Sequence, residues 1–250
     1  MRTHFILASL LISAPVFAVD LQPNEIITME GTSVLESPQL AGAVVWGRDY
    51  DVEINNGFGF VLYKATLEVD VVHTPANNSY MFECRVSNPD GVHPGEVVEI
   101  RWRGFEGFHT DCDWREDFGL GDAVALRVGR SGDGDLITFG YNWWDMDPGG
   151  EKETLQQGEE SNVMFIHTDA PSYLENAGLI TVELKSGDIW SAIAPAPGLI
   201  STDINSDGQV DGADLGILIS DWGTTGPEAD LNLDGIVDGG DLGVLLASWK

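Results

Sequence analysis

The sequence predicts a mainly β protein, an antiparallel β-sandwich followed by a small α-helical module. Three observations lead to this prediction. Six short stretches alternate apolar with polar residues, glycine-rich turn sequences lie between them, and a twenty-residue segment near the C-terminal end occurs twice. Alternation with period two is typical of a half-buried strand. Many short strands without long helical stretches favour two packed antiparallel sheets.

The predicted sandwich covers residues 25–190. Turns are expected at 88–91 (Asn-Pro-Asp-Gly) and 131–134 (Ser-Gly-Asp-Gly), because these residue types adopt turn conformations at little cost. A five-stranded barrel of the OB kind is the alternative fold. The predicted strands are 66–71, 80–86, 97–102, 123–128, 137–143 and 180–184.

Residues 1–18 predict a secretory signal peptide. Arg2 precedes an apolar run from Phe5 to Ile12, and Val16 and Ala18 supply the small residues that a signal peptidase requires, so we expect cleavage after Ala18. The apolar run is too short to cross a bilayer, and no later segment reaches the ~18 apolar residues of a membrane helix. The sequence therefore predicts a secreted or extracellular protein with no membrane span.

The strong negative charge argues against some classes of partner. The formal net charge is −29 at pH 7. A chain of this charge is repelled by nucleic acids and by anionic lipid surfaces. We therefore expect neither as a partner.

Cys84 and Cys112 predict a disulfide, because an even pair of cysteines in an exported protein is usually joined. The bridge would close a loop of about 29 residues and contribute roughly 3.5 kcal/mol in the chain-entropy model. Strand alternation places Cys84 on the same face as Tyr80, Phe82 and Val86, which suits a buried bridge. A catalytic or metal-binding thiol is the alternative.

The duplicated segments, 203–222 and 230–249, are identical at 12 of 20 positions. Each begins with oxygen-bearing side chains at loop positions 1, 3, 5, 9 and 12 and a glycine at position 6. This is the spacing of the EF-hand loop, in which position 7 adds a backbone carbonyl and Ca²⁺ receives six to eight oxygens. Two calcium ions are therefore expected. The predicted ligands are Asp203, Asn205, Asp207, the carbonyl of Gln209, Asp211 and Asp214 in the first loop, and Asp230, Asn232, Asp234, the carbonyl of Ile236, Asp238 and Asp241 in the second.

A helix is expected after each loop. Its apolar residues recur at helical spacing, which predicts one buried face per helix and packing of the two faces against each other. A Pro/Ala linker at 191–200 would separate the helical module at 201–250 from the sandwich. The predicted buried residues are Leu215, Leu218, Ile219 and Trp222 in the first helix, and Leu242, Leu245, Leu246 and Trp249 in the second.

The two segments "DINSDGQVDGADLGILISDW" and "DLNLDGIVDGGDLGVLLASW" resemble the type I dockerin domain. That resemblance implies two calcium ions and docking onto a cohesin-like or cell-surface protein, often in polysaccharide breakdown. Gly212, Ala213, Gly239 and Gly240 occupy loop positions 10 and 11, where cellulosomal dockerins carry recognition side chains.

The middle region resembles uncharacterised exported bacterial proteins of planctomycete type that end in a sorting motif or a dockerin-like tail. The stretches that carry this resemblance are "GFEGFHTDCDW" (104–114), "SGDGDLITFGY" (131–141) and "GEESNVMFIHTDAPSYLENAG" (158–178). It implies no activity, and no motif of a hydrolase, phosphate-binding loop or dinucleotide site is present. We therefore expect a non-catalytic, exported, surface-attached protein with no catalytic residues.

The alternative is a polysaccharide-degrading or carbohydrate-binding component delivered by the dockerin-like tail. If the protein is an enzyme, the abundance of acidic residues favours a glycoside hydrolase. Tyr141, Trp143 and Trp144 are candidates for stacking on a sugar, although one alternating set of them is expected in the core. The scattered histidines His73, His93, His109 and His167 are expected to be surface or turn residues.

Overall fold

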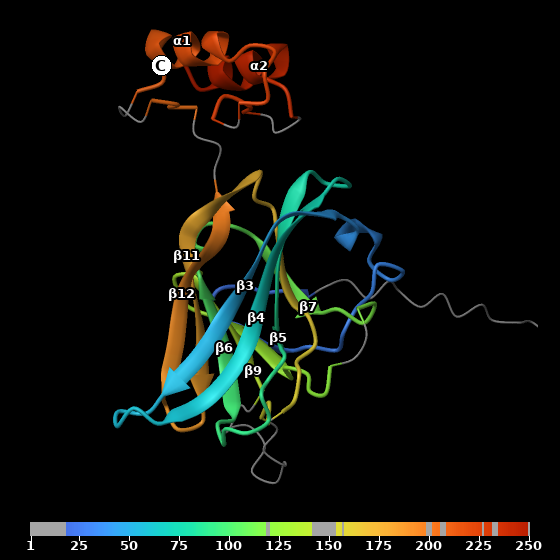
Figure 1. Cartoon of the computed structure of the whole chain (residues 1–250). Helices are drawn as coiled ribbons and strands as arrows, with labels where there is room; N and C mark the ends of the chain where they lie inside the picture. Colours follow the sequence, from blue (N-terminus) through green and yellow to red (C-terminus); the bar gives the residue numbers. More distant parts are fainter. Residues whose placement is uncertain are drawn as a thin grey trace, which may run out of the picture.

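The computed structural model describes residues 19–118, 121–141, 154–156, 158–198, 202–205, 209–226, 228–231 and 235–249. Within these residues the chain forms two six-stranded antiparallel sheets and two α-helices (Figure 1). The predicted signal peptide lies outside the described residues. The elements are β1 (Val19–Asp20), β2 (Ile26–Thr28), the 3-10 helix η1 (Pro38–Leu40), β3 (Ala43–Asn55), β4 (Val61–Thr74), β5 (Ser79–Ser87), β6 (Val97–Arg103), β7 (Thr110–Trp114), β8 (Arg127–Arg130), β9 (Leu136–Gly140), β10 (Met164–Thr168), β11 (Ser172–Leu184), β12 (Ile189–Gly198), α1 (Gly212–Ser220) and α2 (Gly239–Ala247).

The two sheets face each other as the layers of a sandwich (Figure 1). Sheet A has the strand order β1-β7-β10-β5-β4-β3, and sheet B has the order β12-β11-β6-β9-β8-β2. Each sheet keeps two edge strands, whereas an OB-like barrel closes one sheet on itself. The predicted antiparallel sandwich is therefore the better description.

The core lies between the sheets and follows the alternation of the sequence. In β4, Leu67, Val69 and Val71 are buried against sheet B, while Glu68 and Asp70 lie on the opposite face of the strand. Large aromatic rings fill the centre of the core. Trp102, Phe82 and Phe105 meet edge to face with ring centroids 5.5–6.0 Å apart, an arrangement that aromatic pairs favour.

Four of the six predicted strands are confirmed, since 66–71, 80–86, 97–102 and 180–184 lie within β4, β5, β6 and β11. The stretch predicted at 123–128 is only partly a strand, because β8 begins at Arg127 and Ala123 forms an isolated bridge to Ser161. The stretch predicted at 137–143 corresponds to β9, which ends at Gly140; residues 142 and 143 lie outside the described part of the chain.

The turn predicted at 131–134 is confirmed, whereas residues 88–91 form an irregular segment with a bend at Gly91. Asn88 and Gly91 have positive φ angles of 49° and 63°, and so does Gly134 at 78°. The N–H of Gly134 donates to the carbonyl oxygen of Ser131 at 2.9 Å, which closes the second turn. Asparagine and glycine accept this left-handed backbone more readily than other residues.

The linker predicted at 191–200 is wrong over most of its length, because Ile189–Gly198 is the strand β12. Proline suggested a linker, since it cannot donate a ladder hydrogen bond. However, β12 is an edge strand paired only with β11, and edge strands tolerate proline. The carbonyl of Pro195 also accepts the indole N–H of Trp102 at 2.9 Å, which fixes β12 to the core. The sandwich therefore extends to Gly198.

The two helices pack side by side in a small module of their own (Figure 1). Leu218 of α1 and Leu245 of α2 are fully buried, together with Ala229, Leu231 and Val237 from the connecting segments. The buried apolar residues described in the module form a small core.

Candidate metal centre

The first predicted calcium loop ends in a capping box at the start of α1. Asp211, at loop position 9, is the N-cap residue, and its carboxylate accepts the backbone N–H of Ala213 at 2.8 Å. Asp214, at position 12, accepts the backbone N–H of Asp211 at 2.8 Å. Two acidic side chains thus satisfy N–H groups that have no partner within the helix.

The second loop repeats this arrangement at α2. The carboxylate of Asp238 accepts the N–H of Gly240 at 2.7 Å, and Asp241 accepts the N–H of Asp238 at 2.7 Å. The two halves of the sequence repeat therefore have the same local structure where each loop meets its helix.

Further hydrogen bonds fold each loop back on itself. In the first loop, the N–H of Asn205 donates to Asp214 at 3.1 Å, which brings positions 3 and 12 together. In the second, the N–H of Gly235 donates to Asp230 at 2.9 Å, which joins positions 6 and 1. Gly235 has a φ of 91°, so the sharp turn at position 6 requires a residue without a Cβ.

Three of the predicted ligands are buried carboxylates. Asp214 and Asp241 are 0 % exposed and Asp230 is 8 % exposed. The backbone N–H groups, first that of Asp211, lower the pKa of Asp214 and keep it anionic. A carboxylate withdrawn from water is costly unless a positive charge lies near it.

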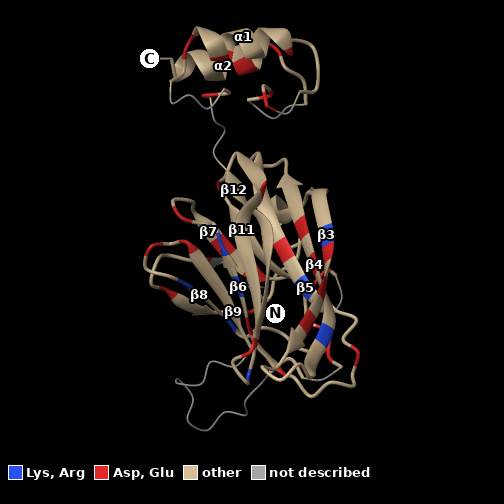
Figure 2. Ribbon diagram, turned by 60° about the vertical axis from the view of Figure 1, so that its left-hand side comes forward, with Lys and Arg blue, Asp and Glu red and all other residues tan. Residues whose placement is uncertain are grey.

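Residues 202–249 of the module supply no such positive side chain, because they contain no Lys, Arg or His. Between described residues, the nine ion pairs that Lys and Arg form with carboxylates all lie in the sandwich. Figure 2 shows acidic positions in the loops beside α1 and α2. An all-oxygen donor set with excess negative charge is what a hard cation such as Ca²⁺ prefers. The residues present thus fit the predicted ion.

The structure describes nine of the twelve predicted ligands. The side chains of Gln209 and Ile236, whose carbonyls were predicted to bind the ion, are exposed. The three remaining positions lie outside the described residues: Asp207, Asn232 and Asp234.

The apolar faces predicted for the helices are only half buried. Leu218 and Leu245 are buried, and Leu215 and Leu242 pack partly against the module core. The prediction is wrong for the second half of each stripe, because Ile219 and Trp222 in α1 and its C-terminal turn are exposed, as are Leu246 and Trp249 after α2. A helix of two to three turns with one packing partner buries only the side that faces it. The sequence periodicity could not show which apolar residues that side contains.

The predicted disulfide is not formed, and Cys84 and Cys112 are both free and buried. Strand β10 lies between them, since Cys84 of β5 pairs with Met164 and Cys112 of β7 pairs with Ile166. Two strand spacings amount to roughly 9.5 Å. A disulfide requires Cα atoms within about 7 Å. Burial raises the pKa of both thiols, so neither is a reactive thiolate.

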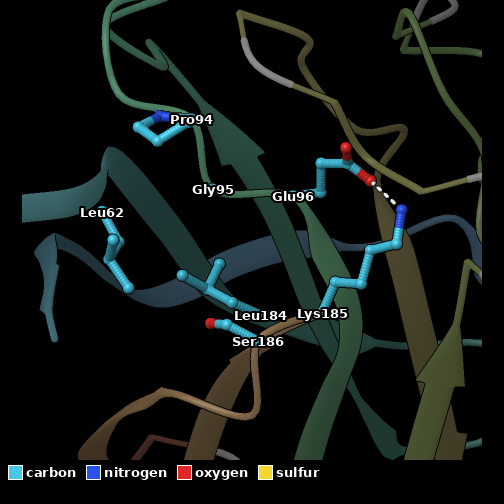
Figure 3. Close-up of a pocket in the computed structure, with 7 residues that line it drawn as sticks. All are labelled: Leu62, Pro94, Gly95, Glu96, Leu184, Lys185 and Ser186. Atoms are coloured by element: carbon cyan, nitrogen blue, oxygen red, sulfur yellow. Dashed lines mark hydrogen bonds and ion pairs between the residues drawn. The ribbon is translucent and has the colours of Figure 1, made fainter.

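The residues proposed for sugar stacking do not form a described platform. Tyr141 is buried in the core, and Trp143 and Trp144 lie outside the described residues. A cavity of about 370 Å³ lies beside the ion pair of Glu96 and Lys185 (Figure 3). Lys185 Nζ lies 2.9 Å from Glu96 Oε2. Aliphatic side chains form the other side of the cavity, so it offers no aromatic surface to a sugar ring. It is lined by Leu62, Pro94, Gly95, Glu96, Leu184, Lys185 and Ser186.

The four scattered histidines divide into two groups. His73 and His93 are partly exposed, and His109 is exposed, as predicted for surface residues. His167 is buried in β10, where its ring nitrogen Nε2 lies 2.8 Å from the hydroxyl of Ser79. The surface assignment is therefore wrong for His167, because β10 is buried on both faces.

No helix among the described residues is long and apolar enough to cross a membrane. Comparison of the chain with protein-family models, curated proteins and solved structures found no match.

Proposed function

We propose that this protein is an exported, calcium-binding docking protein, in which the C-terminal module binds two calcium ions and attaches a non-catalytic β-sandwich to a cell-surface or cohesin-like partner. The observation that carries the proposal is the pair of equivalent loops. Each ends in buried, backbone-held aspartate, and residues 202–249 of the module contain no Lys, Arg or His.

Bound calcium would supply the positive charge that the buried carboxylates need. Asp214 and Asp241 also cap the two helices, so the residues that hold the ion fix where each helix begins. Binding of the ion is therefore coupled to the folding of the module.

The outer surface of the module supports the docking role. Each helix carries two glycines one turn apart with open space around them, followed by an exposed aliphatic residue. Trp222 and Trp249 lie three residues further on and are 47 % and 40 % exposed. Exposed tryptophan beside small residues is typical of a binding surface, because the partner backbone can approach closely while the ring supplies buried area. These two surfaces consist of Gly212, Gly216, Ile219 and Trp222, and of Gly239, Gly243, Leu246 and Trp249.

The partner is expected to present an apolar, flat surface. Polar recognition side chains are scarce on these two faces, so shape and apolar contact must supply most of the affinity. Because the two faces are alike, either could bind the same partner in one of two orientations.

Retention of the protein in the surface fraction of its exporting cell tests the proposal. Asp203→Asn and Asp230→Asn each remove a ligand at loop position 1, outside the capping boxes. We expect each single change to weaken retention in calcium, and the double change to release the protein. Trp222→Ala with Trp249→Ala should also release it while leaving calcium binding intact.

The matched control is Asp221→Asn with Glu228→Gln, which removes two carboxylates of the same module that are outside the predicted ligand set. This variant should be retained like the parent. Full retention of the double loop variant, with the sandwich folded in every protein, would show that the module does not attach the chain.

A further inference from the structure

A second group of metal-ligating side chains lies on sheet A, far along the sequence from the calcium loops. Asp20 of β1 pairs in register with Asp111 of β7, and Asp111 pairs with His167 of β10. His109 precedes Asp111 by two residues and so lies on the same face of the sheet. Three strands thus bring two carboxylates and two imidazoles into one row.

The distances in this row are short. His109 Nε2 lies 2.9 Å from Asp20 Oδ1, and His109 Nδ1 lies 3.9 Å from Asp111 Oδ1. One ligand atom from each of these three residues lies within 4.8 Å of the others. Around a tetrahedral ion with bonds of about 2.05 Å, ligand atoms are about 3.3 Å apart. Small side-chain adjustments would therefore place all three around one ion.

His167 lies beside Asp111. Its Nδ1 is 3.5 Å from Asp111 Oδ2, whereas the contact of Asp111 with His109 is made through Oδ1. Its Nε2 lies 2.8 Å from the hydroxyl of Ser79, which fixes the orientation of the ring. A buried histidine that orients a ligating carboxylate is a common outer-shell partner of a metal site.

Arg130 fixes the backbone on both sides of the row. Its guanidinium donates to the carbonyl oxygens of Phe105 and Phe108 at 3.0 and 2.7 Å, and to that of Leu21 at 3.1 Å. The first two bonds hold the loop before His109, and the third holds the residue after Asp20. The ligands are therefore positioned before an ion arrives, while the exposure of Asp20 and His109 leaves them accessible to it.

We propose that Asp20, His109 and Asp111 bind one divalent transition-metal ion of the zinc class, with His167 as the positioning residue. Mixed imidazole and carboxylate ligands suit zinc, whereas calcium prefers oxygen alone. The ion joins β1, a strand of two residues, to β7 and so fastens the start of the folded sandwich. Without the ion, the same contacts make a simple histidine–carboxylate pair.

Titration of the exported full chain with zinc chloride by calorimetry tests this site. Millimolar calcium is present throughout, so that the calcium loops are saturated. We expect one zinc ion per chain and a rise in the thermal midpoint. His109→Ala and Asp20→Asn should each weaken binding at least ten-fold. Cobalt chloride should give the visible absorption of a tetrahedral site in the parent and lose it in both variants.

His93→Ala is the matched control, because His93 also contacts a carboxylate, that of Asp90, but among the described residues it belongs to no group of three metal-ligating side chains. It should bind zinc like the parent, and so should the Asp203→Asn, Asp230→Asn double variant, which separates this site from the calcium module. The proposal is overturned if the parent shows no saturable zinc binding below 1 mM. It is equally overturned if binding survives both ligand changes, or if His93→Ala loses it to the same degree.

Discussion

Asp214 and Asp241 are both helix caps and proposed calcium ligands. One oxygen of each accepts a backbone N–H and caps a helix, while the side chain is buried in a segment, residues 202–249, without Lys, Arg or His. A buried charged carboxylate is stabilised by a cation bound beside it. On the proposed function, the same carboxylates would couple the folding of the module to the binding of calcium.

Cys84 and Cys112 behave as small apolar core residues. Both are buried, and burial raises the pKa of their thiols. We expect the folded protein to react with a thiol reagent more than a hundred-fold slower than the protein in denaturant. Mass spectrometry of an alkylated, non-reducing digest should find two free cysteines. A Cys84–Cys112 linked peptide, or rapid labelling in native buffer, would contradict the packing of β5, β10 and β7.

These cysteines also show what a single residue pattern can predict. Strand alternation placed Cys84 correctly on the core face, because that inference is local. The pairing depended on which strands are neighbours, and β10 had no recognisable signal. It is buried on both faces, so its sequence does not alternate. The proximity of Asp20 and His109 could not be predicted from the sequence for the same reason, since only the order of strands in the sheet brings them together.

At the scale of elements, the outer face of sheet A carries a buried ion pair. Glu83 of β5 and Arg115, which follows β7, are 2.7 Å apart and both buried. Burial is the largest influence on Glu83 and raises its pKa from 4.5 to about 7, while Arg115 opposes the rise. The unfolded chain loses this proton near pH 4.5, whereas the folded chain keeps it until about pH 7.

Stability should therefore fall as pH rises across this window, because the folded state binds more protons there than the unfolded state. Glu83→Gln removes this dependence. We expect the free energy of unfolding of the parent, relative to that of Glu83→Gln, to fall by on the order of 1–3 kcal/mol between pH 4.5 and 7 and to level off above it. Urea unfolding at a series of pH values measures it, with the exposed Glu106→Gln as control. A constant or rising difference would show that Glu83 is ionised throughout.

Strands whose sequences alternate apolar with polar residues were predictable and others were not. The alternating strands β4, β5 and β6 were located from sequence alone, although β5 is buried on both faces. By contrast, β3 is an edge strand exposed over most of its length, and β12 contains prolines at the edge of sheet B. Neither β3 nor β12 resembles a half-buried strand, but pairing with a neighbouring strand makes each of them a long strand in the folded protein. The loop-plus-helix units were predictable because all their signals lie within twenty residues.

At the scale of the whole molecule, the chain combines a large sandwich with a small module of different chemistry. The sandwich has a continuous apolar core and, among its described residues, nine ion pairs of Lys or Arg with carboxylates. The module has five buried apolar residues among those described, and a net charge of −9 over residues 201–250, from nine Asp and one Glu against one Lys. Calcium at 100 times its dissociation constant would stabilise each proposed site by about 2.7 kcal/mol. We therefore expect the module to be the part of the molecule whose folding depends on the ion.

Native mass spectrometry of the full chain with excess calcium measures the number of bound ions directly. We expect two calcium ions in the parent, one in Asp203→Asn or Asp230→Asn, none in the double variant, and two in the Asp221→Asn, Glu228→Gln control. Hydrogen exchange on the same samples should show protection of 203–249 lost in a calcium-selective chelator, with the sandwich unchanged. A parent that binds no calcium, or a double variant that still binds two ions, would contradict the account.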